Sequence, residues 1–136
     1  MKQIKEHLEK NKIGQLATVK NGQAIQRPFQ FIFLKDNMFY FMTSNTKNVY
    51  RDLVDNPTAS FITLDERKSF TRVRGEIEFV KDLSIKEEIL DKEPMVKMIY
   101  KSADNPVMEV FRIHTGVASL HTGTGQTIEE VEFKRP

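Results

Sequence analysis

The residues best suited to chemistry stand together where a run of apolar residues gives way to a polar turn. Thr43, Ser44 and Thr46 carry hydroxyl groups there, and Lys47 carries an ammonium group. The turn precedes a predicted helix, whose first backbone N–H groups lack partners and whose dipole favours an anion. Together these groups could bind a phosphate. The alternative interpretation is that Thr46 caps the helix and Lys47 is a solvated surface charge.

A second candidate segment is Arg27-Pro28, inside a strand predicted from Gln23 to Leu34. Proline has no N–H group to donate, so it is confined to a sheet edge or to a bulge. A bulge would re-aim Arg27 and expose the backbone of residues 27–30 to a ligand. Alternatively, Pro28 protects an edge strand from aggregation and Arg27 lies on the surface. The residues alone leave both interpretations open.

Other catalytic patterns are missing from the sequence. Its three His residues, His7, His114 and His121, stand in separate segments without the spacing of metal ligands, so we expect no metal site. There is no Cys, no serine-hydrolase elbow and no glycine-rich phosphate loop. No side chain is therefore assigned a catalytic role, and any chemistry is expected to come from a bound cofactor.

Composition predicts a single domain covering residues 1–136. The net charge of +2 gives no strong attraction to nucleic acid or to a membrane surface. No apolar run approaches the roughly 18 residues of a membrane span, and the first residues lack the apolar core of a signal peptide. We therefore expect a cytoplasmic protein that binds neither nucleic acid nor membrane.

The elements that must position these residues are mostly strands joined by short turns. Asn21-Gly22 is a strong hairpin signal, because a type I′ turn needs positive φ at both positions. Segments with strand character are Ile13–Val19, Gln23–Leu34, Met38–Thr43, Thr58–Leu64, Phe70–Val80 and Val107–His114. Val117–Leu120 either extends the last of these after Gly116 or pairs with it. Segments with helical character are residues 2–11, the stretch after Lys47 that ends at Asn56-Pro57, Leu83–Lys92 and the turns from Pro94. Antiparallel hairpins with few helices predict a mainly β domain, a closed or partly closed barrel.

Three local details add to this prediction. Ser84 and Glu87 have the spacing of a capping box at the start of a helix. Gly75 indicates a bulge or a close approach of two backbones. The polar tail from Thr122 is expected to lie along the surface or across a partner subunit.

Several short motifs, in order along nearly the whole chain, resemble the pyridoxamine 5′-phosphate oxidase-like proteins. More narrowly, they resemble the short single-domain members of that flavin-binding split-barrel superfamily. The motifs are Leu16-Ala17-Thr18-Val19, Arg27-Pro28-Phe29, Phe39-Tyr40-Phe41-Met42-Thr43, Thr46-Lys47-Asn48-Val49-Tyr50, Asn56-Pro57, Arg72-Val73-Arg74-Gly75 and Lys101-Ser102-Ala103-Asp104-Asn105-Pro106.

The resemblance implies a six-stranded antiparallel split barrel that forms a homodimer with FMN at the subunit interface. It implies that Arg27, Pro28, Phe29 and Gln30 line the flavin ring. It also implies that Thr43 and Ser44, with Thr46 and Lys47, hold the ribityl chain and the phosphate. This agrees with the anion site inferred from residue types alone.

For function, the resemblance implies an FMN-dependent oxidoreductase that acts on a small molecule, with NAD(P)H as a candidate electron donor. The alternative is a flavin-binding or stress-related module without catalysis. Haem and deazaflavin are other ligands that the superfamily allows. The chain has no Trp, and the surroundings of Arg112-Ile113-His114 differ from the substrate segment of the full-length oxidase. We therefore do not expect pyridoxamine phosphate oxidation itself.

Overall fold

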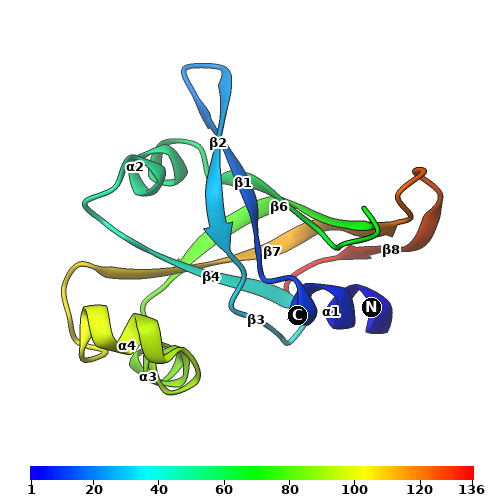
Figure 1. Ribbon diagram of the computed structural model, residues 1–136. Coiled ribbons are helices and arrows are strands. Elements are labelled where there is room, and N and C mark those ends of the chain that lie inside the picture. Colours follow the sequence, from blue (N-terminus) through cyan, green and yellow to red (C-terminus); the bar gives the residue numbers. More distant parts are fainter.

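The computed structural model describes residues 1–136 and consists of eight strands and four helices (Figure 1). The strands are β1 (Ile13–Lys20), β2 (Gln23–Gln30), β3 (Phe33–Lys35), β4 (Met38–Ser44), β5 (Thr58–Leu64), β6 (Phe70–Val80), β7 (Met108–His121) and β8 (Thr127–Phe133). The helices are α1 (Lys2–Lys10), α2 (Asn48–Asp55), α3 (Leu83–Lys92) and α4 (Pro94–Tyr100). The predicted mainly β class is confirmed, with more strands than the predicted six or seven.

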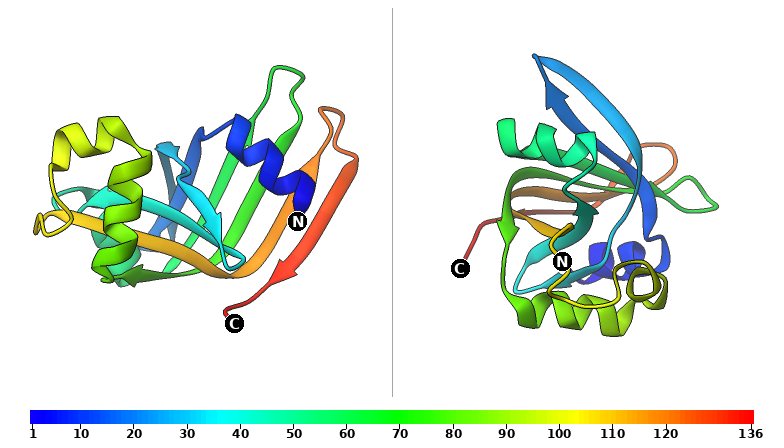
Figure 2. Two further views of the ribbon diagram at one scale, coloured as in Figure 1. Left: turned by 90° about the horizontal axis from the view of Figure 1, so that it is seen from below. Right: turned by 90° about the vertical axis from the view of Figure 1, so that its left-hand side faces the viewer.

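All strand pairs are antiparallel, in the order β2-β1-β5-β6-β7-β4-β3, and β8 pairs with β7 outside this order. The two ends of the order meet at Phe31 and Ile32, which connect β2 to β3. The Phe31 N–H donates to the Lys12 carbonyl at 2.8 Å, and the Ile32 N–H donates to the Tyr40 carbonyl at 3.0 Å. The sheet therefore curves back on itself as a partly closed barrel, and Figure 2 shows the strands around a common interior.

This junction corrects the prediction of one long strand from Gln23 to Leu34. The chain pairs with β1 up to Gln30 and then changes partner to β4 from Phe33 onward. Phe31 and Ile32 are both apolar and both buried where the two ends of the sheet meet, so the sequence shows an unbroken apolar run from Phe31 to Leu34. A change of pairing partner leaves no mark in such a run.

The barrel interior is an aromatic core. Phe41 is fully buried, and its ring centroid lies 5.1 Å from that of Phe61 and 5.4 Å from that of Phe111. Helix α1 contributes Ile4 and Leu8 to this core, and helix α2 contributes Val49 and Leu53. Both helices are thus held to the barrel by apolar pairs spaced four residues apart.

A second apolar layer lies on the outer face of β4 and β7, under α3 and α4. Tyr40, Met108 and Val110 belong to this layer, together with Ile89 and Leu90 of α3. Strand β4 is therefore covered on both faces, since Phe39 and Phe41 point into the barrel. This explains why Met38–Met42 reads as an almost unbroken apolar run rather than as an alternation.

Other local predictions are partly corrected. The residue that caps α3 differs from the predicted Ser84. Asp82 precedes the helix, and its carboxylate accepts a hydrogen bond from the Ser84 N–H at 2.9 Å. Val117–Leu120 extends the preceding strand through Gly116, which is one of the two predicted arrangements, and the tail adds a further strand, β8, against β7. The close approach at Gly75 is confirmed, since an added Cβ would lie 1.9 Å from the Thr115 carbonyl oxygen.

No helix of the structure has the length and apolar character needed to cross a membrane. No group of three or more His, Cys, Asp or Glu side chains is arranged to hold a metal ion.

Candidate functional site

Ser44 organises the polar turn between β4 and α2. Its hydroxyl lies 2.8 Å from the Thr46 hydroxyl and accepts from the Thr46 N–H at 3.3 Å. Its carbonyl accepts from the Lys47 N–H at 3.1 Å. The chain consequently turns tightly after the strand and enters α2 at Asn48.

Asn45 anchors this turn to the segment before β7. Its side-chain amide donates to the Pro106 carbonyl at 2.8 Å and to the Glu109 carboxylate at 3.0 Å. Its N–H donates to the Val107 carbonyl at 2.9 Å. Asn45 was not among the predicted site residues, although Asn is favoured in turns because its side chain bonds to nearby backbone. Glu109 had no sequence signal, because it is 64 residues away.

Glu109 is a buried carboxylate with two partners. The Lys81 ammonium lies 2.8 Å from its Oε1 atom, and Asn45 donates to Oε2. Burial raises the pKa of this carboxyl, but the hydrogen bonds from Lys81 and Asn45 outweigh burial and hold the pKa below its ordinary value. Glu109 is therefore ionised at neutral pH and holds the turn in place through a charged hydrogen bond.

The outer side of the turn carries unused donors. Thr46 and Lys47 are exposed, and the Lys47 ammonium forms no ion pair within the chain. The N–H groups of Asn48 and Val49, in the first turn of α2, donate to no other part of the chain. Lys47 is the residue before the helix, and no side chain caps it. The predicted cap at Thr46 is thus wrong, and the helix start stays open to an anion.

Thr43 lies inside rather than on the outer side of this turn. It is buried, and its hydroxyl has no hydrogen-bond partner in the chain. An unpaired buried hydroxyl carries a free-energy cost, so it is a position where a bound group would be stabilising. The structure thus brings Ser44, Thr46 and Lys47 together at the helix entrance, with Thr43 just behind them.

The other predicted segment, Arg27–Gln30, lies in β2 at the edge of the sheet. Its register against β1 is regular, with Leu16 opposite Arg27 and Gln15 opposite Pro28. The bulge that one interpretation of Pro28 required does not occur. The edge position of Pro28 is confirmed, because β2 pairs with β1 alone and a proline on the free edge breaks no ladder. The surface position that the same interpretation gave to Arg27 is not, because its guanidinium is mostly covered and paired with Asp52.

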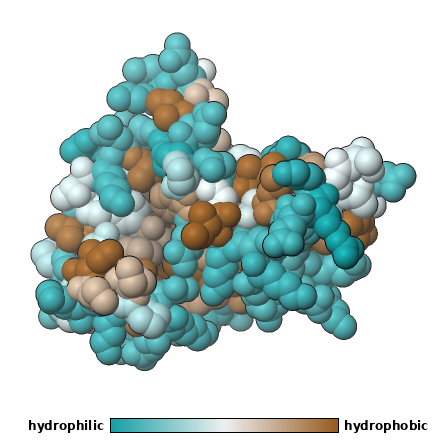
Figure 3. All heavy atoms as spheres, viewed as in Figure 1, coloured by the Kyte–Doolittle hydropathy of each residue, from teal (hydrophilic) through white to brown (hydrophobic).

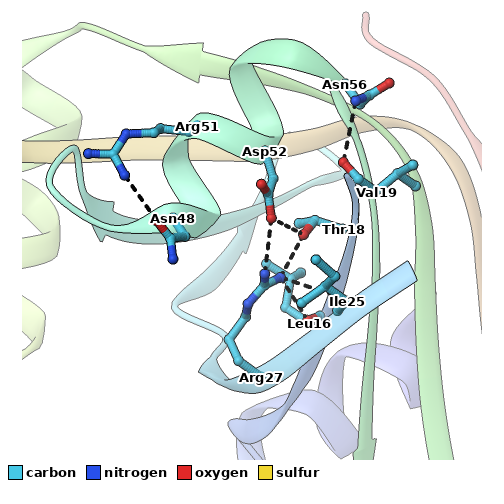
Figure 4. Close-up of polar contacts among 9 residues, drawn as sticks. All are labelled: Leu16, Thr18, Val19, Ile25, Arg27, Asn48, Arg51, Asp52 and Asn56. Atoms are coloured by element: carbon cyan, nitrogen blue, oxygen red, sulfur yellow. Dashed lines mark hydrogen bonds and ion pairs between the residues drawn. The ribbon is translucent and has the colours of Figure 1, made fainter. Parts of the chain in front are cut away.

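Arg27 is turned toward helix α2 rather than toward solvent (Figure 4). Its guanidinium donates to the Thr18 hydroxyl at 2.8 Å and to the Asp52 carboxylate at 3.2 Å. Thr18 donates to the same oxygen of Asp52 at 3.0 Å. Thr18 and Asp52 were not predicted as site residues, because nothing in the local sequence links Arg27 to a carboxylate 25 residues away.

The remaining residues of this segment point to different places. Phe29 packs into the barrel, with ring centroids 6.1 Å from Phe41 and 5.8 Å from Phe111. The Gln30 amide donates to the carboxylate of Glu93, between α3 and α4, at 3.3 Å. Side chains alternate across a strand, so these four residues do not share one face. What they share is the free backbone edge of β2.

The two candidate segments form an open surface rather than an enclosed pocket. None of the five principal pockets is lined by residues 43–47 or by residues 27–29, and one of them includes Gln30.

On the same side of the molecule as these segments, brown and tan residues gather over α4 (Figure 3). Met95, Met98 and Ile99 are the exposed apolar residues of that helix.

The His residues and Arg112 lie elsewhere and have structural partners. His7 Nδ1 forms a hydrogen bond with the Thr71 hydroxyl at 2.7 Å, and its Nε2 atom lies 3.2 Å from the Asp65 carboxylate. Arg112 donates to Glu78 at 2.7 Å and to the Tyr40 hydroxyl at 2.7 Å. Its charge and donors are therefore committed within the sheet.

Comparison with solved structures agrees with this architecture. A NimC/NimA family protein from Clostridium acetobutylicum is 26% identical over 98% of this chain and 90% of its own length, with a TM-score of 0.84. A haem-binding protein from Mycobacterium smegmatis is 16% identical over 96% of this chain and 56% of its own, with a TM-score of 0.79. A protein described as F420 reductase is 20% identical over 79% and 89%, with a TM-score of 0.60.

No curated protein matches this chain. The family model described as pyridoxamine 5′-phosphate oxidase matches residues 1–121. This match covers most of the chain and includes both candidate segments. The protein belongs to the pyridoxamine 5′-phosphate oxidase family.

Proposed function

We propose that the protein binds FMN and is a flavin-dependent oxidoreductase acting on a small molecule. The observation that carries this proposal is the turn before α2, where free N–H groups, the Thr46 hydroxyl and the unpaired Lys47 ammonium converge. Such a set of donors suits the phosphate of a mononucleotide. Family membership supports a flavin as the rest of the ligand.

The residues present fit FMN in three respects. Ser44 and Thr46 supply hydroxyls for the phosphate or ribityl chain, and the Thr43 hydroxyl lacks a partner. Lys47 supplies the positive charge. On the free edge of β2, the carbonyls of Pro28 and Gln30 and the Gln30 N–H are available for the polar rim of a flavin ring.

FMN, when bound, supplies hydride or electron transfer, and the residues of this chain bind and orient it. Lys47 and the start of α2 would fix the phosphate end. Strand β2 would fix the ring end, with Phe29 holding that strand to the barrel core. No side chain in either segment is assigned to proton transfer.

A homodimer is part of the same proposal. The candidate surface is open within one chain, so a flat ring lying on it would keep one face in water. A second copy placed over this surface would cover the ring and exclude solvent. Sedimentation of the purified protein should give twice the chain mass, and a monomer that binds FMN tightly would remove this part of the proposal.

The test of FMN binding is a visible spectrum. Protein soaked in FMN and then dialysed should keep flavin absorption bands, and NAD(P)H with a suitable acceptor should bleach and restore them in repeated cycles. If the protein kept haem or a deazaflavin after dialysis but did not keep FMN, that ligand would replace FMN in the proposal. Relatives described as haem-binding and as F420 reductase make both controls necessary.

A second candidate function is flavin binding without turnover. It is favoured by one observation, that the side chains around the turn and along β2 include no group positioned for acid–base catalysis. It predicts retention of FMN but no consumption of NAD(P)H above that of free FMN. Turnover well above the rate of free FMN would reject it.

A further inference from the structure

Asp52 is the one buried charged residue of helix α2, with 5% of its surface exposed. Its Oδ2 atom accepts two hydrogen bonds, from the Thr18 hydroxyl and from the Arg27 guanidinium (Figure 4). A buried carboxylate is stable only when it is paired and hydrogen-bonded. Arg27 and Thr18 therefore hold the middle of α2 to β2 and β1, in addition to the apolar contacts of Val49 and Leu53.

Arg27 joins three elements through one planar group. Its Nη1 atom donates to Thr18 and to the Leu16 carbonyl of β1, at 2.8 and 3.3 Å, and its Nη2 atom donates to Asp52 of α2. Arg27 itself belongs to β2. The contact between Arg27 and Asp52 is the one polar link between β2 and α2.

We infer that Asp52 is a positioning residue of the proposed phosphate site, acting through Arg27 to hold the N-terminus of α2 in register with the ring strand β2. This inference rests on the proposed binding of FMN. A ligand with its phosphate at Lys47 and its ring along residues 27–30 would span the two elements that this pair connects. Strand β2 has no sheet neighbour on its other edge, so no ladder fixes this spacing from that side.

The direction in which Asp52→Asn changes FMN binding separates this role from the main alternative, in which Arg27 binds the phosphate itself. If Arg27 were a phosphate ligand restrained by Asp52, then Asp52→Asn would free the guanidinium and tighten FMN binding. If Asp52 acts by positioning, Asp52→Asn weakens the binding of the phosphate end. The structure favours positioning, because both Nη atoms of Arg27 already donate within the chain, while the Lys47 ammonium and the N–H groups of Asn48 and Val49 do not.

The experiment compares FMN with riboflavin, which has the same ring but no phosphate, by flavin fluorescence titration. The quantity of interest is the ratio of the riboflavin to the FMN dissociation constant. Asp52→Asn and Arg27→Gln should each lower this ratio by roughly tenfold or more, the size of a charged hydrogen bond. The double variant should lose no more than the larger single loss, because both changes break the same link.

Asp55→Asn is the matched control, since Asp55 lies on the same helix, is exposed and pairs with no cation. It should leave the ratio unchanged. Thermal unfolding of every variant, read by circular dichroism, separates loss of structure from loss of phosphate recognition. If the Asp52→Asn variant does not fold, the Arg27→Lys variant takes its place in the experiment. Lysine keeps the positive charge but lacks the planar group that reaches Thr18 and Asp52 together. Arg27→Lys should also lower the ratio.

Three results would overturn the inference: an unchanged ratio in folded Asp52→Asn protein, tighter FMN binding in that variant, or additive losses in the double variant. In each case the wild-type protein would still bind FMN, so the proposed function would stand. If wild-type protein bound neither flavin, the proposed function would fail and this inference with it.

Discussion

Lys47 is the residue whose charge should matter most for ligand binding, because its ammonium stands at the open end of α2 and pairs with no carboxylate. Lys47→Ala should weaken FMN binding by about 1.5–3 kcal/mol, the value of a hydrogen bond to a charged group. Equilibrium titration with FMN measures the change.

Lys97→Ala is the control for Lys47, since Lys97 is also exposed and unpaired but lies on α4. It should leave the dissociation constant as it is. An equal effect of the two substitutions would mean that Lys47 acts only through net charge, and no effect of either would place the phosphate elsewhere.

Glu109 should make the stability of the protein depend on pH in the acid range. The pKa of its carboxyl is below the ordinary value in the folded state, because the bonds from Lys81 and Asn45 outweigh burial. The unfolded chain therefore takes up a proton first as the pH falls. The stabilisation is complete above the ordinary pKa of about 4.3 and is lost as the pH falls through the folded value.

The corresponding measurement is the unfolding temperature of wild-type and Glu109→Gln protein at neutral pH and at a pH below both pKa values. The gap between them should be widest at neutral pH and should shrink in acid. Glu87 is an exposed carboxylate without partners, so the Glu87→Gln variant should have the same unfolding temperature as the wild type at both pH values. A gap that stays constant with pH would contradict the assigned role of Glu109.

Residue types and local spacing were enough to predict the Thr43–Lys47 turn, because its hydrogen bonds run between residues two or three apart. They were not enough to predict what holds the turn and the arginine. The partner of Asn45 is Glu109 and the partner of Arg27 is Asp52, and both pairs form only after distant strands come together. Sequence spacing carries no information about such pairs without a fold.

At the scale of elements, Gly75 marks a close approach of the β6 and β7 backbones. A Cβ added at Gly75 would lie 1.9 Å from the Thr115 carbonyl oxygen and 2.8 Å from the Gly116 Cα atom. Gly75→Ala should therefore lower the free energy of unfolding by about 1–3 kcal/mol or more, since these atoms belong to the backbone and can shift only if a strand moves. Urea unfolding monitored by circular dichroism measures the loss.

Gly125→Ala serves as the comparison for Gly75→Ala. Gly125 has a φ of +93° but no atom within 4 Å of an added Cβ, so it tests backbone conformation without a clash. Its loss should be the smaller of the two. A smaller loss at Gly75 than at Gly125 would mean that the two strands can separate without cost.

Element boundaries followed from the sequence where turn chemistry marks them. Asn21-Gly22 adopts the positive φ values, 52° and 76°, that its type I′ turn requires, and the predicted bounds of β5, β6 and α3 match the structure. The boundary between β2 and β3 was missed, because no turn residue stands at Phe31-Ile32. The chain there changes neighbours without changing direction enough to need Gly or Pro.

At the scale of the whole molecule, barrel closure places the candidate site. Phe31 and Ile32 join the two ends of the sheet, which brings the free edge of β2 to the side where β4 leads into α2. The aromatic core behind this surface, including Phe29, Phe41 and Phe111, keeps both segments in fixed positions. A ring and a phosphate could thus be recognised together by these two segments.

The measurement that tests flavin binding at this surface most directly is the change in backbone amide chemical shifts of isotope-labelled protein during titration with FMN. The largest changes should fall on the amides from Thr46 to Tyr50 and on those of β2 near Arg27–Gln30. Riboflavin should shift the β2 amides but leave the start of α2 nearly unchanged. If the FMN-dependent shifts instead gathered around His7 or Arg112, with the start of α2 silent, the phosphate would bind elsewhere and the proposed site would be wrong.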